Sequence, residues 1–250
     1  MTELEAQRFS ALCRADTVMN TFDGDGIGTY NEKRLHRILK RFITENAECY
    51  ETRLGRYVAD VVCDGVIYEI QTSSFRTLSE KIRYYLENTE LSVCIMRPIV
   101  VGKTLIRAQR DTGEVIKVSR SSKKGRESDV LPELYHLLEC VGNERLSVRI
   151  MLVNAEEYRF SEAQRYRKKG RYDCDLRPTS LVGDKILCGV DGWRSLLCDE
   201  LLCGEFSVAD FERATRTRGR NRYYALTALC SLGVVEKRTE GRRNYYSISK

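Results

Sequence analysis

The stretch Tyr57–Phe75, YVADVVCDGVIYEIQTSSF, constrains the fold of this chain more than any other segment. Two runs rich in valine, isoleucine and tyrosine flank the dipeptide Asp64-Gly65. This dipeptide is a strong signal for a two-residue β-turn, because Asp and Gly tolerate the positive φ angles of a type I′ turn. A turn at these residues also fixes the strand register, which then sets Asp60 opposite Glu69. We therefore predict a tight hairpin within an apolar core.

The predicted register brings two carboxylates face to face. Directly opposed residues have Cβ atoms roughly 4.5–5.5 Å apart, and two carboxylates at that spacing repel each other unless a positive charge lies between them. A hard divalent cation, Mg²⁺ or Mn²⁺, would meet this need, because it takes carboxylate oxygens, backbone carbonyls and water as ligands. The alternative is an edge hairpin whose acids point into solvent, answered by an arginine. Val58 and Gln71 would share the acid-bearing face, while Ala59, Val61, Tyr68 and Ile70 form an apolar face that we expect to pack against helices.

Two predicted helices flank this hairpin in the sequence. The first runs from Thr29 to about Phe42, and Glu32 extends its apolar stripe; Glu32 also completes a capping box with Thr29, and the two interpretations are compatible. The second runs from about residue 77 to residue 88 and carries Lys81 on its apolar stripe. A lysine in that position either extends its ammonium group outward to solvent or reaches toward the two acids.

Helical patterns alternate with apolar strand patterns over most of the chain, which indicates an α/β sheet covered by helices. We expect residues 1–27 to form an N-terminal segment, residues 28–160 the α/β domain, and residues 161–191 a basic, irregular linker. Residues 192–250 change in character, so we expect them to form a small unit of their own.

The C-terminal residues resemble a winged helix-turn-helix. A helix over residues 193–204, a second helix capped by Ser207, and a third from about Arg220 to Leu232 precede two short strands around a basic turn. In such modules the third helix meets the major groove and the wing meets the backbone. Protein contacts or dimerisation are the alternative use of this module. The residues that the resemblance makes available to nucleic acid are Arg218, Arg220, Arg222 and Tyr223, with Arg242 and Arg243 on the wing.

The placement of charge points to a polyanionic partner. The net charge is +6, and five arginines with no acid lie between Arg213 and Arg222. Two further basic blocks occur, RSSKKGR at 120–126 and RYRKKGR at 165–171. Such clusters are typical of nucleic-acid binding, although any one of them is also explained by solubility.

The remaining composition favours a cytoplasmic protein. None of the ten cysteines forms a CxxC pair, so we interpret them as reduced thiols. The longest apolar run is interrupted by Arg97 and Pro98 and is too short to span a bilayer. The first ten residues lack the apolar core of a signal peptide. We therefore expect no contact with a membrane; the oligomeric state stays open, with a homodimer among its outcomes.

A helical Glu32, a strand Asp60, and Glu69-x-Gln71 on the paired strand followed by a helix together resemble the PD-(D/E)XK nuclease superfamily. The stretch over residues 58–74, with KIRYYL after it, is most similar to the CoiA-like branch, which also has Gln where most members have Lys. The helix-first order also resembles archaeal-type Holliday junction resolvases. The resemblance covers about residues 28–91 and implies a restriction-endonuclease-like mixed sheet flanked by helices.

The resemblance also implies metal-dependent phosphodiester hydrolysis on duplex or branched DNA. Asp60 and Glu69 would bind Mg²⁺ or Mn²⁺, with the Ile70 carbonyl and Glu32 completing the shell. Gln71 stands where the family's lysine polarises the attacking water; an amide orients water but brings no positive charge, which Lys81 would then have to supply. The alternatives are an inactive nuclease fold that binds DNA or regulates, and an RNA-processing nuclease.

Overall fold

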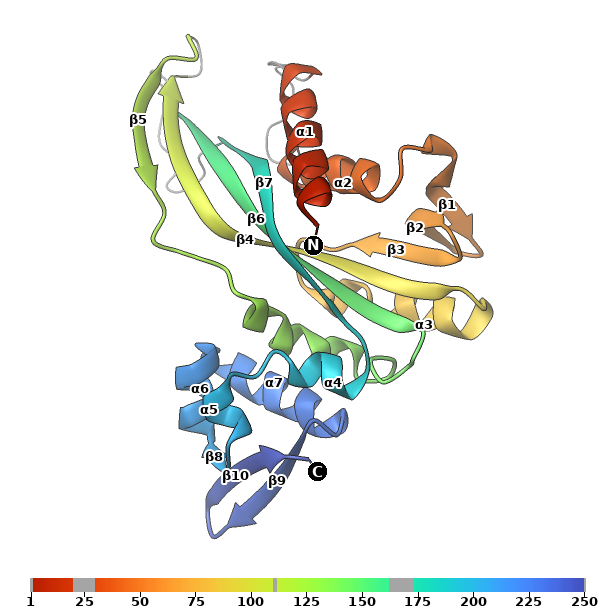
Figure 1. The fold of residues 1–250 in the computed structure, drawn as a ribbon, viewed down its shortest axis with the longest axis vertical. Coiled ribbons are helices and arrows are strands. Elements are labelled where there is room, and N and C mark those ends of the chain that lie inside the picture. The colour runs from red at the N-terminus through yellow and green to blue at the C-terminus, as the bar shows by residue number, and fades with distance from the viewer. Residues whose placement is uncertain (1, 20–29, 110–111, 162–172, 250) are drawn as a thin grey trace. The chain divides into compact units, whose positions relative to one another are not determined.

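The computed structural model describes residues 2–19, 30–109, 112–161 and 173–249 (Figure 1). The protein is an α/β structure with a mixed seven-stranded sheet flanked by helices, in the strand order β1-β2-β3-β4-β6-β7, with β5 paired to β4. This confirms the α/β class and the mixed sheet that the sequence predicts. The strands of this sheet are β1 (Tyr50–Leu54), β2 (Tyr57–Cys63), β3 (Val66–Ile70), β4 (Ser92–Gln109), β5 (Val115–Arg120), β6 (Leu146–Ser161) and β7 (Asp173–Leu187).

The helices and a second, three-stranded sheet complete the described elements. The second sheet has the order β8-β10-β9, with β8 at Phe206–Ser207, β9 at Val235–Glu240 and β10 at Arg243–Ile248. No helix in the described part of the chain is both long and apolar enough to cross a membrane. The helices are α1 (Glu3–Met19), α2 (Tyr30–Ile43), η1 (Ala47–Cys49), η2 (Phe75–Thr77), α3 (Ser79–Asn88), η3 (Glu127–Leu137), α4 (Gly189–Arg194), α5 (Asp199–Leu202), α6 (Val208–Thr215) and α7 (Arg220–Ser231).

The chain divides into two compact units that interleave along the sequence. Unit 1 contains residues 1–50, 98–126 and 151–184, and unit 2 contains residues 51–97, 127–150 and 185–250. Each predicted domain is one continuous stretch of sequence, whereas each unit combines three separate stretches. The domain limits therefore stay a prediction.

The hairpin of unit 2 has the predicted turn and register. Asp64 and Gly65 both have positive φ angles, 50° and 75°, as a type I′ turn requires. Cys63 pairs with Val66 and Val61 pairs with Tyr68 in the antiparallel ladder. The Asp-Gly signal was sufficient because turn geometry and loop length together determine which residues face each other.

β3 is an inner strand of the sheet, and residues on both of its faces are buried. It pairs antiparallel with β2 and parallel with β4, to which α3 connects it. Ile67 and Glu69 on one face and Ile70 on the other are at most 2% exposed. Side chains of α3 contact Glu69 on the acid-bearing face, so a helix covers this face of β3.

In unit 1, the N-terminal segment forms α1, which packs against α2. Phe9 of α1 meets Phe42 of α2 edge to face, with ring centroids 5.5 Å apart. The buried Asp16 accepts a hydrogen bond of 2.6 Å from Arg37 Nε. Phe9, Leu12 and Asp16 recur at helical spacing, so the sequence does carry a signal for α1.

The C-terminal residues of unit 2 form short helices around aromatic contacts. A capping box of Ser207 and Asp210 starts α6, as predicted. Trp193 is fully buried, and the rings of Phe206 and Tyr246 stack with centroids 5.9 Å apart. α7 packs against η3, where Tyr224 stacks on a tyrosine of η3.

Two local expectations need correction. Residues 173–187, expected in an irregular linker, form β7, while residues 162–172 of that linker lie outside the described residues. The single helix expected over residues 193–204 is two short helices, α4 and α5, with a break between them. η3 is a 3-10 helix that contains Pro132; proline lacks the N–H that α-helical bonding needs.

Replacing Gly55 with alanine should destabilise the protein more than replacing Gly65. Both glycines have positive φ angles, 59° and 75°, so both variants carry a backbone cost of about 1–2 kcal/mol. A Cβ at position 55 would lie 2.0 Å from Tyr84 Oη, whereas a Cβ at position 65 would have no neighbouring atom within 4 Å. Tyr84 packs edge to face on Tyr57, and displacing it should cost about 1 kcal/mol more.

Equilibrium unfolding in urea would measure this difference. Equal decreases in unfolding free energy for the two variants would contradict the packing of Tyr84 against the β1–β2 turn.

Candidate functional site

The centre of the candidate site is the buried side chain of Glu69 on β3. Glu69 is 2% exposed, and α3 supplies a hydrogen-bond donor to each of its carboxylate oxygens. Lys81 Nζ donates to Oε2 at 2.7 Å, and Tyr85 Oη donates to Oε1 at 3.2 Å. Lys81 and Tyr85 are four residues apart and so lie on the same face of the helix. Of the two interpretations for Lys81, the structure has the one in which it reaches the acids.

Asp60 lies beside this pair on β2 and has a different partner. Its Oδ2 accepts a hydrogen bond of 2.8 Å from the Ile70 N–H. In a regular antiparallel ladder, that N–H would donate to a backbone carbonyl of the opposing strand. The negative charge of Asp60 is close enough to raise the pKa of Glu69. The two acids predicted to face each other are therefore electrostatic neighbours.

Burial dominates the protonation of Glu69. Loss of solvation raises the pKa of this carboxyl from 4.5 to about 7, against the lowering effect of Lys81 and with a smaller raising effect of Asp60. Because this folded-state pKa lies above the ordinary value, Glu69 binds more protons in the folded protein than in the unfolded chain between pH 4.5 and about 7. Ionisation of Glu69 therefore reduces the free energy of unfolding as the pH rises through that window.

Gln71 directs its amide away from the acids. Its Nε2 donates to Ser74 O, Ser73 Oγ and Thr77 Oγ1 in the segment between β3 and α3. Its backbone N–H continues the ladder to Met96 O at 2.9 Å. The side chain thus fixes the connection that leads into α3, and through it the start of the helix that carries Lys81.

Two further residues hold the same connection. Glu133 of η3 accepts hydrogen bonds from Ser74 Oγ at 2.8 Å and from the Phe75 N–H at 2.9 Å. Arg97 donates to Gln71 O at 3.0 Å, and its guanidinium lies over the Phe75 ring. The segment that connects β3 to α3 is therefore held by two charged side chains, Glu133 and Arg97.

The described residues include three of the four predicted metal ligands, Asp60, Glu69 and Ile70. No group of three or more His, Cys, Asp or Glu side chains suited to a metal ion occurs among them. Glu32 belongs to α2, but its side chain lies outside the described residues. A carboxylate has about four lone-pair positions, and Lys81 and Tyr85 use two of those on Glu69, so oxygen positions remain for a hard cation.

The arginines predicted to meet nucleic acid differ in their surroundings. Arg218 and Arg220, at the start of α7, are exposed, and neither makes an ion pair with another described residue. Arg222 instead forms an ion pair with Glu212 of α6 and lies over the ring of Tyr223, with 4.9 Å between its Cζ and the ring centroid. Arg242 and Arg243 are exposed at the turn between β9 and β10.

A comparison with protein-family models matched one family to the α/β part of the chain. A family model described as Domain of unknown function (DUF8091) matches residues 33–188, more than half of the chain. The chain belongs to the DUF8091 family. No curated protein and no solved structure matched the chain.

The DUF8091 match includes the hairpin and α3 but not all of the predicted site. Asp60, Glu69, Gln71 and Lys81 lie inside it, whereas Glu32 directly precedes its first residue. Residues 189–250, with α7 and the β9–β10 hairpin, follow its last residue. The acid cluster is thus part of the DUF8091 region, and the C-terminal arginines are not.

The sequence predictions include no site role for Tyr85, Glu133 or Arg97. For Tyr85, the spacing of four from Lys81 is a usable signal, because it puts both side chains on the same face of α3. Glu133 carries no such signal, because it lies 58 residues from Phe75 in the sequence. Only the packing of η3 brings it to the connection.

Lys81→Met should raise the pKa of Glu69 above its value of about 7 in the parent protein. The substitution removes both the charge and the hydrogen bond that favour the carboxylate. Carbon-13 NMR titration of labelled glutamate side chains would measure the shift.

Arg83→Met is the matched control for this titration, because Arg83 pairs with Glu139 on the exposed side of α3. An unchanged or lowered pKa in Lys81→Met would contradict the contact between Lys81 and Glu69.

Proposed function

We propose that the protein is a metal-dependent DNA endonuclease whose C-terminal residues form a winged-helix DNA-binding module. The observation that carries the proposal is the 2.7 Å contact between Lys81 Nζ and Glu69 Oε2. It sets an ammonium group beside the acid pair, which the nuclease motif needs and Gln71 does not provide. The mixed sheet flanked by helices, and the order of Asp60, Glu69 and Lys81 on β2, β3 and α3, also support it.

The donor set suits a hard divalent cation. Asp60, Glu69 and the Ile70 carbonyl would hold the ion, with Glu32 as a further ligand, and all of these are oxygen donors. Bound Mg²⁺ or Mn²⁺ would supply Lewis acidity and a water of lowered pKa. A nearby cation would also favour the ionised form of Glu69, which burial alone disfavours.

The side chains of α3 have distinct roles in this proposal. Lys81 orients Glu69 and places a positive charge where a scissile phosphate would carry its developing negative charge. Tyr85 fixes the other oxygen of Glu69 and, being fully buried, keeps water from that side of the carboxylate. Gln71 acts through the connection to α3, which it holds in position, so it is a positioning residue.

The C-terminal module would supply affinity for the DNA backbone. Helices α6 and α7 followed by the β9–β10 hairpin have the order of a helix-turn-helix with a wing. The exposed Arg218, Arg220, Arg242 and Arg243 would contact phosphates and give salt-sensitive binding that does not depend on sequence.

A second candidate function is a nuclease fold without activity that binds DNA or regulates. One observation favours it: Gln71 spends its amide donors on Ser73, Ser74 and Thr77 rather than on the acid pair. Asp60 likewise has a structural partner in the Ile70 N–H. In this case the acid cluster maintains the fold of the hairpin.

Asp60→Asn, Glu69→Gln and Lys81→Met should each lower Mn²⁺-dependent cleavage by about 100-fold or more, because each removes a charge that acts on the metal or the phosphate. Cleavage of linear, single-stranded and four-way-junction DNA, and of RNA, would be followed on gels. The matched controls are Asp64→Asn at the hairpin turn and Arg83→Met on the outer face of α3.

Cleavage that persists in Asp60→Asn and Glu69→Gln would move the active site elsewhere. Absence of cleavage by the parent protein on every substrate would favour the second candidate function.

Arg218→Ala combined with Arg220→Ala should weaken DNA binding and reduce the slope of log affinity against log salt concentration by about 1 for each phosphate that is no longer neutralised. Fluorescence anisotropy over a series of salt concentrations would measure both quantities. Arg213→Ala with Arg238→Ala is the matched control, since both arginines are paired with acids. An unchanged slope in the first variant would reject α7 as the DNA-contacting helix.

A further inference from the structure

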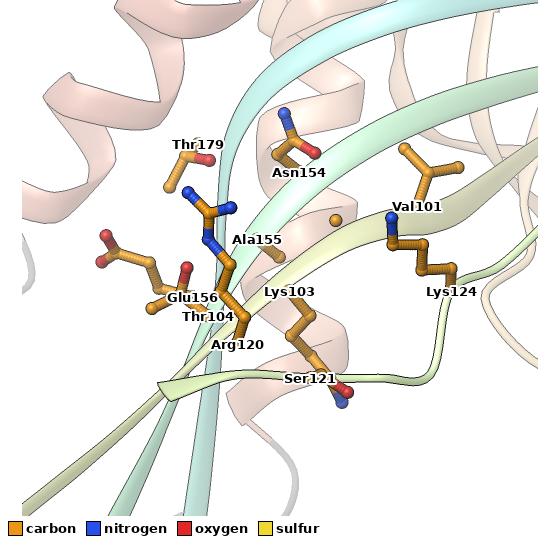
Figure 2. Close-up of a pocket in the computed structure, with 11 residues that line it drawn as sticks. Val101, Lys103, Thr104, Arg120, Ser121, Lys124, Asn154, Ala155, Glu156 and Thr179 are labelled. Atoms are coloured by element: carbon orange, nitrogen blue, oxygen red, sulfur yellow. The ribbon is translucent and has the colours of Figure 1, made fainter. Parts of the chain in front are cut away.

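A surface pocket in unit 1 lies on the outer parts of four strands. It has a volume of about 520 Å³, within the range of about 300–1,000 Å³ that small-molecule sites occupy. β4 supplies one wall, the end of β5 and the loop after it a second, and β6 with β7 the third (Figure 2). The lining is mostly polar and draws on these residues: Gly102, Lys103 and Thr104; Arg120, Ser121 and Lys124; Asn154 and Glu156; and Thr179.

The pocket has more positive than negative charge, and two of its three cations make no ion pair with any residue that the structure describes. Lys103 is engaged in an ion pair with Glu157, outside the lining. Arg120 and Lys124 are exposed, and no ion pair or side-chain hydrogen bond joins them to another part of the described chain. In Figure 2 their side chains extend on the two sides of Asn154. The lining carboxylate, Glu156, accepts a hydrogen bond of 3.1 Å from Tyr158 Oη.

The polar wall between these cations is built by a close approach of two strands. Asn154 lies directly over Gly102, where an added Cβ would be 2.2 Å from Asn154 Oδ1. Asn154 Nδ2 donates to Ser180 Oγ at 3.1 Å, which fixes the amide. A Cβ at position 102 would displace the Asn154 amide, so glycine lets Asn154 lie close against β4 as part of the polar wall.

We propose that this pocket binds the phosphate group of a nucleotide, either within a nucleic-acid strand or free. A guanidinium matches two phosphate oxygens at once, an ammonium group adds a point charge, and the hydroxyls of Ser121 and Thr179 can donate to the remaining oxygens. The strand form of the ligand rests on the proposed nuclease function; the free form does not.

Arg120→Ala combined with Lys124→Ala tests the proposal in the full-length protein without divalent metal and with EDTA, so that binding is read without cleavage. The two probes are a fluorescein-labelled DNA oligonucleotide and fluorescent adenosine monophosphate, with anisotropy as the measurement. Lys117→Ala with Lys123→Ala removes the same charge from exposed positions outside the lining and is the matched control.

We expect the pocket variant to bind at least one probe several-fold more weakly than both the parent and the control. Weaker binding of the oligonucleotide, with a salt slope reduced by about 1, identifies a strand phosphate; weaker binding of the monophosphate alone identifies a free nucleotide. Equal affinities in the pocket variant and the control, or no binding of either probe by the parent, would overturn the proposal. The proposed function fails separately, by absence of metal-dependent cleavage in the parent.

Discussion

The burial of Glu69 between β3 and α3 is the interaction on which the candidate site depends. A carboxylate removed from water is strongly destabilised unless donors replace its hydration. Lys81 and Tyr85 are those donors, and both come from one face of α3. The helix must therefore pack on β3 in one register for the strand to tolerate its acid. Loss of either donor would leave a buried group short of partners, at a cost of about 1–3 kcal/mol or more for a charge.

The same contacts tie the hairpin to more distant parts of unit 2. Gln71 and Glu133 of η3 both bond Ser74 in the connection between β3 and α3, the first through the Ser74 carbonyl and the second through its hydroxyl. Two residues further along η3, Tyr135 stacks on Tyr224 of α7 with ring centroids 4.4 Å apart. A continuous series of contacts thus joins the acid cluster to the helix that carries the exposed arginines, although the two are far apart in the sequence.

Ion pairing separates the basic residues of the chain into two classes. Arg222 and Lys103 belong to basic stretches or to a basic pocket, yet each is neutralised by a glutamate. Arg218, Arg220 and Lys124 belong to the same kinds of stretch and are exposed without such a partner in the described structure. A surface cation whose charge is already balanced gains little from a phosphate, so the unpaired surface residues are the ones expected to contact phosphates in the C-terminal module and in the pocket of unit 1.

The sequence by itself determined the hairpin, its turn and register, the α2 and α7 helices and the α/β class, because each depends on local turn geometry or on periodicity within one segment. Spacing on one helix also put Lys81 on the buried stripe. Only the tertiary structure decided that Lys81 meets Glu69, that Gln71 turns to Ser74, and that Glu133 and Arg97 hold the connection. These contacts join residues from separate elements, and no local pattern fixes the orientation of a side chain across such a distance. β7 and the pocket over Gly102 arise in the same way, from strand neighbours that the chain order does not reveal.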